Sequence, residues 1–154
     1  MHDLHGWRHL SVGDLGRLGR RGKFPRDVSL RLMVSIANSK PGAALSDEIA
    51  SLLLSQIDSW RREAPVIADG FPSAPSHIDK LPAMSGIVHL QCDLDLREPR
   101  LMLRGEKTAR KWTPGLPSER DQRLDDLLIK GRTTPRFMEV DNNVSVEMLA
   151  QRAR

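Results

Sequence analysis

The sequence predicts an α/β protein with a short parallel sheet. Two short apolar runs, at 65–68 and 86–91, lack the strict alternation of a strand with one wet face. Continuous apolar character of this kind is typical of a parallel strand covered on both faces. Turn residues separate these runs from segments with helical periodicity, so strands and helices alternate along the chain. The 154 residues have the length of one domain and can bury a core of ordinary size.

The first part of the chain contains a strand followed by helical segments. Residues 7–11 predict a short strand that ends in Ser-Val-Gly-Asp, where Ser11 or Asp14 can cap a following helix. Residues 26–36 carry apolar side chains at helical spacing, and Lys40-Pro41-Gly42 ends that segment.

Ser46 then opens the clearest helix, because Asp47 and Glu48 in its first turn complement the helix dipole. Its apolar face contains Ile49, Leu52, Leu53, Ile57 and Trp60. The run at 65–68 ends in the turn Asp69-Gly70-Phe71-Pro72.

The second part repeats the alternation of strands and helices. After the strand at 86–91, residues 94–104 predict a helix in which Pro99 lies in the first turn or causes a kink. Glycines and prolines at 105–117 predict a mobile surface loop. Residues 136–140 predict a last strand, and 145–152 predict a final helix. Ligands of open parallel sheets bind at the carboxyl ends of the strands, which indicates 11–14, 69–72 and the residues after Gln91.

Basic residues gather in two segments of an otherwise acidic chain. Residues 8–31 carry seven Lys or Arg against two acids, residues 97–136 carry eleven against six, and the remainder carries six against twelve. Because arginine forks match phosphate oxygens, this distribution favours a polyanion such as nucleotide phosphates, and nucleic acid is an alternative. The single cysteine, Cys92, excludes an internal disulfide and is interpreted as a small buried residue. The absence of an export signal and of long apolar stretches predicts a cytoplasmic protein without a membrane partner.

The turn Asp69-Gly70-Phe71-Pro72 resembles the Asp-Gly-Phe-Pro turn of nucleoside monophosphate kinases, the adenylate kinase family. Other segments, between His5 and Leu149, follow in the order of that family. Residues 9–17 are similar to the strand that delivers a monophosphate-binding arginine, and 42–54 to the helix over the acceptor. Residues 87–104 are similar to the strand and paired arginines before the lid, and 104–110 and 123–124 to the two ends of the lid. Residues 140–147 are similar to the last strand and helix.

The resemblance implies a truncated P-loop kinase-like three-layer sandwich. Residues 1–154 would form a single adenylate kinase-like domain, with an acceptor-binding helical segment at about 14–62 and a short lid at about 105–122. The implied reaction transfers phosphate from ATP to AMP or a related monophosphate, with Mg²⁺ as the cofactor.

The resemblance also implies roles for individual residues. Asp69 would orient Mg²⁺ through waters, and Arg17 would hold the phosphate of the acceptor. Charge on the transferring group would be neutralised by Arg100, Arg104, Arg110 and Arg123. The substrate would contact Ser11, Gly13, Arg17, Leu45, Gly70 and His77.

The sequence departs from the family at several positions. It contains no G-x-x-x-x-G-K-[ST] loop, so we expect either that an N-terminal piece is missing or that the chain is a degenerate relative. The missing strand would lie between those at 66–68 and 87–91, whose edges then pair directly, accept another segment or stay unpaired. Ser73 replaces a phosphate-binding arginine, and His77 replaces a glutamine that reads adenine.

Two alternative functions follow from the departures and from the basic charge. The first is an inactive nucleotide-binding or regulatory module. The second is a basic nucleic-acid-binding domain. Phosphoryl transfer is expected only if a phosphate-binding loop is supplied upstream. The sequence makes no prediction of the oligomeric state.

Overall fold

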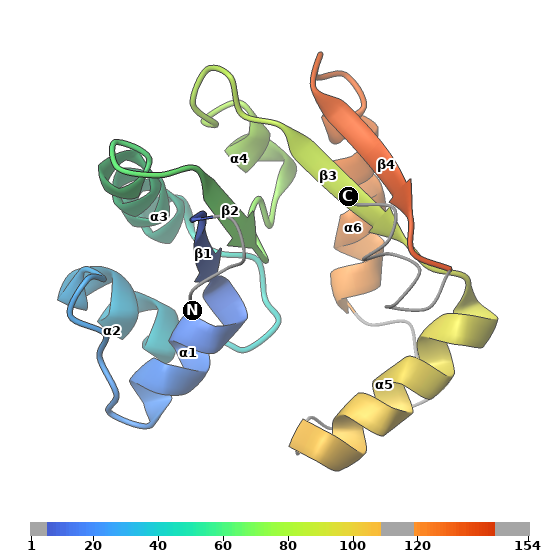
Figure 1. The fold of residues 1–154 in the computed structure, drawn as a ribbon, viewed down its shortest axis with the longest axis horizontal. Coiled ribbons are helices and arrows are strands. Elements are labelled where there is room, and N and C mark those ends of the chain that lie inside the picture. Colours follow the sequence, from blue (N-terminus) through green and yellow to red (C-terminus); the bar gives the residue numbers. More distant parts are fainter. Residues whose placement is uncertain (1–5, 109–118, 144–154) are drawn as a thin grey trace.

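The structure is a computed structural model that describes residues 6–108 and 119–143, and it has a mixed α/β fold (Figure 1). Helices alternate with short strands along the chain, as the sequence predicts. In chain order the elements are β1 (Arg8–Ser11), α1 (Val12–Arg20), α2 (Leu30–Asn38), α3 (Asp47–Trp60), β2 (Val66–Asp69), α4 (Pro75–Ile78), β3 (Ile87–Gln91), α5 (Leu94–Thr108), α6 (Glu119–Gly131) and β4 (Phe137–Asp141).

The four strands form two parallel pairs. β1 pairs with β2, and β3 pairs with β4. Figure 1 shows β2 and β3 as the inner strands of the two pairs, with all four strands directed toward the side where α1 and α5 begin. β2 and β3 are not hydrogen-bonded to each other in the part of the chain that the structure describes. Of the three arrangements open to these edges, the described residues therefore adopt the unpaired one.

The main core lies between the first sheet and helices α1, α2 and α3. Leu10, Leu32, Met33 and Leu53 are fully buried there. The two helices α1 and α2 approach closely because α1 presents glycines to α2. A Cβ placed on Gly19 would lie 2.8 Å from the Cβ of Ala37, so a larger residue would push the helices apart.

Helix α3 begins and packs as its sequence predicts. The Oγ of Ser46 accepts a hydrogen bond from the amide of Ile49 at 3.3 Å and caps the helix. At the other end, the indole of Trp60 is buried and donates to the carbonyl of Asp27 at 3.1 Å. Trp7, which precedes β1, is by contrast 44% exposed.

A smaller core covers one face of the second sheet. Leu127 and Leu128 of α6 are buried near α4, and a Cβ on Gly131 would lie 3.0 Å from the ring of Phe137. α6 lies behind β3 and β4 in Figure 1. The other face of these strands is exposed, because Val88, Leu90 and Met138 are 59%, 62% and 59% exposed.

The prediction of a strand at 86–91 covered on both faces is therefore wrong for the described residues. Its apolar sequence permits two covering layers, but the described helices supply one. The three-layer arrangement that the resemblance implies accordingly stays a prediction.

The region expected to form a lid is more helical than the sequence predicts. Helix α5 continues through Gly105 to Thr108, and α6 begins at Glu119, so both ends of the expected segment 105–122 are helical. Gly105 lowers helix stability by only about 1 kcal/mol, which its neighbours can offset. Pro99 lies inside α5 rather than in its first turn. The final helix predicted at 145–152 lies outside the described residues, as does 109–118.

Replacing Leu53 by alanine tests the main core. The side chain is fully buried, so Leu53→Ala is expected to lower the free energy of unfolding by about 2–5 kcal/mol. Leu30→Ala is the matched control, because Leu30 is 62% exposed and its loss should change stability by less than about 0.5 kcal/mol. Urea denaturation followed by circular dichroism measures both. Equal losses in the two variants would contradict the described packing.

Candidate functional site

The parallel register of the first sheet places Ser11 beside Asp69 at the carboxyl ends of β1 and β2. The hydroxyl of Ser11 donates to Oδ2 of Asp69 at 3.3 Å and accepts from the amide of Asp14 at 3.3 Å. The same side chain therefore caps α1 and orients the carboxylate on the next strand. Asp69 is exposed, whereas Ser11 is buried.

A glycine occupies each of the two turns at this edge. Gly70 has a φ of +79°, a conformation that favours glycine, and a Cβ there would lie 3.4 Å from Cβ of Val12. A Cβ on Gly13 would lie 3.3 Å from Nη1 of Arg17. The guanidinium of Arg17 is thus folded back against the first turn of α1.

Arg17 forms an ion pair with Asp14 on the same helix. Partial burial works to raise the pKa of Asp14, but the hydrogen bond and the charge of Arg17 outweigh it and hold that pKa below its ordinary value. Ser11, Gly13, Asp14, Arg17 and Asp69 together are called the edge cluster below. The sequence singled out four of them as site residues and treated Asp14 only as a possible helix cap.

A second group joins the turn after β2 to the start of α3. Ser73, which the sequence analysis marked only as a departure, accepts a hydrogen bond from the amide of Leu45 at 2.9 Å. The amide of Ser73 donates to Nδ1 of His77 at 3.3 Å, and the ring of His77 stacks on Phe71 with centroids 5.4 Å apart. Nε2 of His77 lies 3.6 Å from Oδ1 of Asp47.

His77 and Leu45 are packed residues in this structure, since they are 1% and 8% exposed. Their contact with a substrate, which the resemblance implies, stays a prediction. Desolvation lowers the pKa of His77, and the ammonium of Lys80 adds to that effect, while the carboxylate of Asp47 opposes it. A buried neutral imidazole that accepts a backbone hydrogen bond explains the histidine at this position.

The arginines expected around the donor phosphates start from different elements. Arg100 on α5 donates to the carbonyl of Asn142 at 2.6 Å and to Sγ of Cys92 at 3.3 Å, so it lies at the carboxyl ends of β3 and β4. Arg104 is exposed one turn further along α5. Arg123 on α6 donates to the carbonyl of Gly42, in the loop before α3. Arg110 lies outside the described residues.

The partly exposed thiol of Cys92 corrects its interpretation as a buried apolar residue. Its place after β3, where the chain leaves the sheet, explains the exposure.

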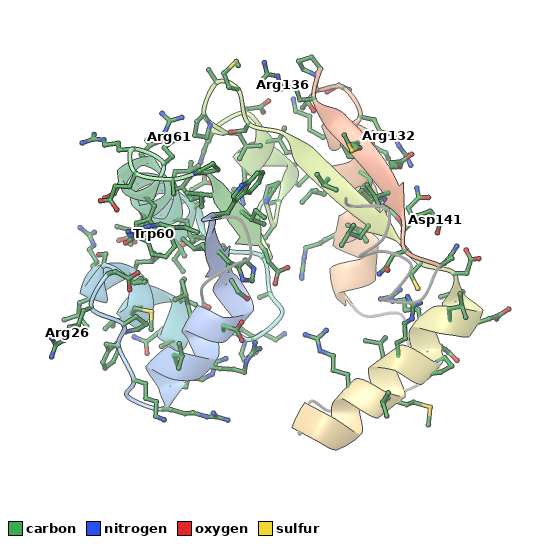
Figure 2. The ribbon with its side chains drawn as sticks, viewed as in Figure 1. Arg26, Trp60, Arg61, Arg132, Arg136 and Asp141 are labelled. Carbon is green, nitrogen blue, oxygen red and sulfur yellow. The ribbon has the colours of Figure 1, made fainter. Side chains whose placement is uncertain are left out.

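A cavity of about 330 Å³ lies at the opposite end of the second sheet, away from the edge cluster. It is lined by Ile78, Leu81, Pro82, Met84, Ser85, Ile87, Thr134, Pro135 and Arg136. Figure 2 shows Arg136 and Asp141 at opposite ends of β4, and the cavity belongs to the Arg136 end. Arg136 closes one side of it by donating to the carbonyl of Met84 at 2.9 Å.

The described residues contain no cluster of three or more His, Cys, Asp or Glu side chains that could hold a metal ion directly. A magnesium ion held through waters by Asp69 alone would not require such a cluster. No helix within 6–108 or 119–143 has the length and apolar character needed to cross a membrane. Searches against protein-family models and against curated proteins give no match for this chain.

Replacing Ser11 by alanine tests the cap and the link to Asp69. Ser11→Ala removes the acceptor for the amide of Asp14, so we expect the free energy of unfolding to fall by about 0.5–2 kcal/mol. Ser51→Ala removes an exposed hydroxyl from α3 and should change stability by less than about 0.5 kcal/mol. Urea titrations compare the two variants. An unchanged midpoint for Ser11→Ala would show that the cap contributes nothing.

The lowered pKa of His77 predicts a loss of stability on acidification. As the pH falls through about 6.5, the unfolded chain takes up a proton on this ring, whereas the folded chain takes it up only at lower pH. Titration of His77 therefore leaves the free energy of unfolding unchanged above about pH 6.5 and lowers it below that pH. In His77→Gln the glutamine can still accept from the amide of Ser73, and the decrease between about pH 7.5 and 5.5 should be smaller. Unfolding free energies at several pH values measure this, and parallel curves for the two proteins would rule out His77 as the cause.

Proposed function

We propose that this chain binds a nucleoside monophosphate at the edge cluster and takes part in phosphoryl transfer to it. The observation that carries the proposal is the contact of Ser11 with Asp69 at the carboxyl ends of two adjacent parallel strands, with Arg17 paired to Asp14 in the helix that follows. Ligands of open parallel sheets bind at such ends, and the start of a helix there offers backbone amides to an anion.

The chemistry of the edge cluster suits a phosphate and a magnesium ion in adjacent positions. Arg17 would exchange the carboxylate of Asp14 for phosphate oxygens, and the absence of a side chain on Gly13 leaves room beside its guanidinium. The exposed carboxylate of Asp69 is a hard oxygen ligand that can hold magnesium through waters. The ion would neutralise charge on the phosphates, while Ser11 keeps the carboxylate oriented.

The donor side would use arginines near the ends of the second sheet. Because β1 to β4 point the same way, the start of α5 lies on the same side of the molecule as the edge cluster (Figure 1). Arg100, in the second turn of α5, reaches back to Cys92 and Asn142 beside that start, and Arg104 follows one turn later. The unpaired edges of β2 and β3 agree with a sheet that lacks one central strand, the place where the resemblance puts the strand and loop that hold the donor phosphates.

The second candidate is a nucleotide-binding module without turnover. It is supported by Ser73, which takes the place of a phosphate-binding arginine and instead fixes the amide of Leu45. The burial of His77 also supports it, since that ring is not exposed to a base. The two candidates share the edge cluster and differ in whether phosphate is transferred.

Calorimetric titration with AMP tests the shared site. Replacing Arg17 by alanine removes the guanidinium that would meet the phosphate, so affinity should fall by about 10- to 100-fold, the equivalent of a charged hydrogen bond. Arg20→Ala on the last turn of α1 is the matched control and should bind AMP as the unaltered chain does. An absence of AMP binding, or equal losses in both variants, would refute the site.

Turnover separates the two candidates. The chain is extended upstream by an apolar strand and a G-x-x-x-x-G-K-[ST] loop, then incubated with ATP, AMP and magnesium. Formation of ADP that depends on Arg17 supports the phosphotransferase. Retained AMP binding without ADP supports the inactive module.

A further inference from the structure

The loop between α1 and α2 is fixed at both of its ends. The amide of Lys23 donates to the carbonyl of Leu18 at 2.9 Å, and Gly22, with a φ of +68°, lets the chain turn there as it leaves α1. At the far end the buried side chain of Gln56 on α3 donates to the carbonyl of Asp27 at 3.1 Å. The side chains between these two points are therefore displayed on a defined backbone.

This loop, residues 21–29 and called the basic loop below, carries three exposed cations. They are Arg21, Lys23 and Arg26, and none of them forms an ion pair among the residues that the structure describes. Figure 2 shows Arg26 directed outward from the ribbon. The acid of the loop, Asp27, is also exposed and pairs with none of the three.

The arginines on either side of the basic loop have partners within the protein. Arg20 donates to the carbonyl of Ala37 at 3.4 Å, and Arg31 forms an ion pair with Glu48 at 2.9 Å. The fold therefore gives these two arginines a role. It gives none to the three cations between them, whose charge is available to an external anion.

An exposed aromatic ring lies among these cations. Phe24 follows Lys23 directly and is 46% exposed, whereas Val28, at the far end of the loop, is buried. An exposed ring can stack on an unpaired base, and cations beside it can neutralise the phosphates that flank the base. A lipid surface is bound by a helix with a broad apolar face, which a loop with one exposed ring does not offer. The charge and the ring together favour a nucleic acid.

We propose that the basic loop binds single-stranded nucleic acid. Phe24 stacks on a base, while the three cations lie on successive phosphates. These contacts read no sequence, because every base has a face and the phosphates repeat along the strand. The expected dissociation constant is that of non-specific binding, about 1–100 μM. The basic loop follows the last turn of α1, whereas Ser11 and Asp69 lie before its first turn, so the proposal does not rest on the nucleotide site.

Salt dependence tests the phosphate contacts. Fluorescence anisotropy measures binding of the whole chain to a labelled thymidine oligonucleotide of about 12 nucleotides without a terminal phosphate. Each neutralised phosphate contributes a slope of about −0.7 to log K against log salt concentration, so three cations predict about −2. Arg26→Gln should reduce the steepness by about 0.7. Arg136→Gln removes the same charge on the far side of the molecule in Figure 2 and should leave the slope unchanged.

The outcomes of that titration decide the phosphate contacts. Absence of binding at about 100 μM chain and low salt would overturn the proposal, since non-specific complexes form in that range. Equal changes of slope in the two variants would overturn it as well, because the charge would then act from anywhere on the surface.

The stacked base is tested by removing either partner. Phe24→Ala should weaken binding by about fivefold or more with an unchanged salt slope, and Phe24→Tyr, which keeps the ring, should retain the affinity. An abasic oligonucleotide should bind the unaltered chain as weakly as the thymidine oligonucleotide binds Phe24→Ala, and it should bind both proteins equally. Circular dichroism verifies that the variants are folded. Equal affinity of the unaltered chain for abasic, duplex and single-stranded probes would refute stacking.

Two further measurements separate this surface from other binding modes. The chain is sedimented with vesicles of phosphatidylcholine and phosphatidylserine, and sedimentation that depends on Phe24, without oligonucleotide binding, would assign the loop to a membrane instead. AMP at about 1 mM should not displace the oligonucleotide. Displacement would place the strand at the edge cluster and overturn the proposal. Failure of AMP binding, by contrast, would refute the nucleotide site and leave the basic loop unaffected.

Discussion

The register between β1 and β2 joins the two parts of the edge cluster, the start of α1 and the end of β2. It sets Ser11 opposite Asp69, and the Ser11 hydroxyl then joins the carboxylate to the first turn of α1. Ser11 is buried and Asp69 is exposed, so the hydroxyl fixes one oxygen of a carboxylate that still faces solvent. A slip of one residue would turn Ser11 away from Asp69 and remove the partner of that carboxylate, although the cap from Ser11 to Asp14 is local to α1 and would persist. Folding and the candidate chemistry thus depend on the same pairing.

Much of the fold can be predicted from the sequence because its signals are local. The strands near 8–11, 66–69, 87–91 and 137–141 follow from short apolar runs, and α3 follows from its cap and apolar face. Helix α6 does not follow from the glycines and prolines at 105–117, which predict only a loop before it. Its leucines, Leu124, Leu127 and Leu128, have helical spacing and end at a glycine, which is a sufficient signal. The number of layers over a strand depends on elements elsewhere in the chain, so apolar composition alone could not decide it.

A site residue could be predicted from the sequence where it follows the end of a strand. It could not be predicted where burial decides whether the side chain packs or faces a ligand. Ser11 and Asp69 follow from their positions after two strands. The packing of His77 could not be read from the sequence, because it results from the ring of Phe71 and the amide of Ser73 closing around it.

The contact between Arg123 and Gly42 spans the two halves of the chain. It attaches α6, which rests on the second sheet, to the loop that leads into α3 on the first. Gly42 has a φ of +79°, so this loop is shaped at a point where the backbone can adjust without side-chain obstruction. Any movement of α6 relative to α3 would therefore have to break this hydrogen bond or carry the loop along with it.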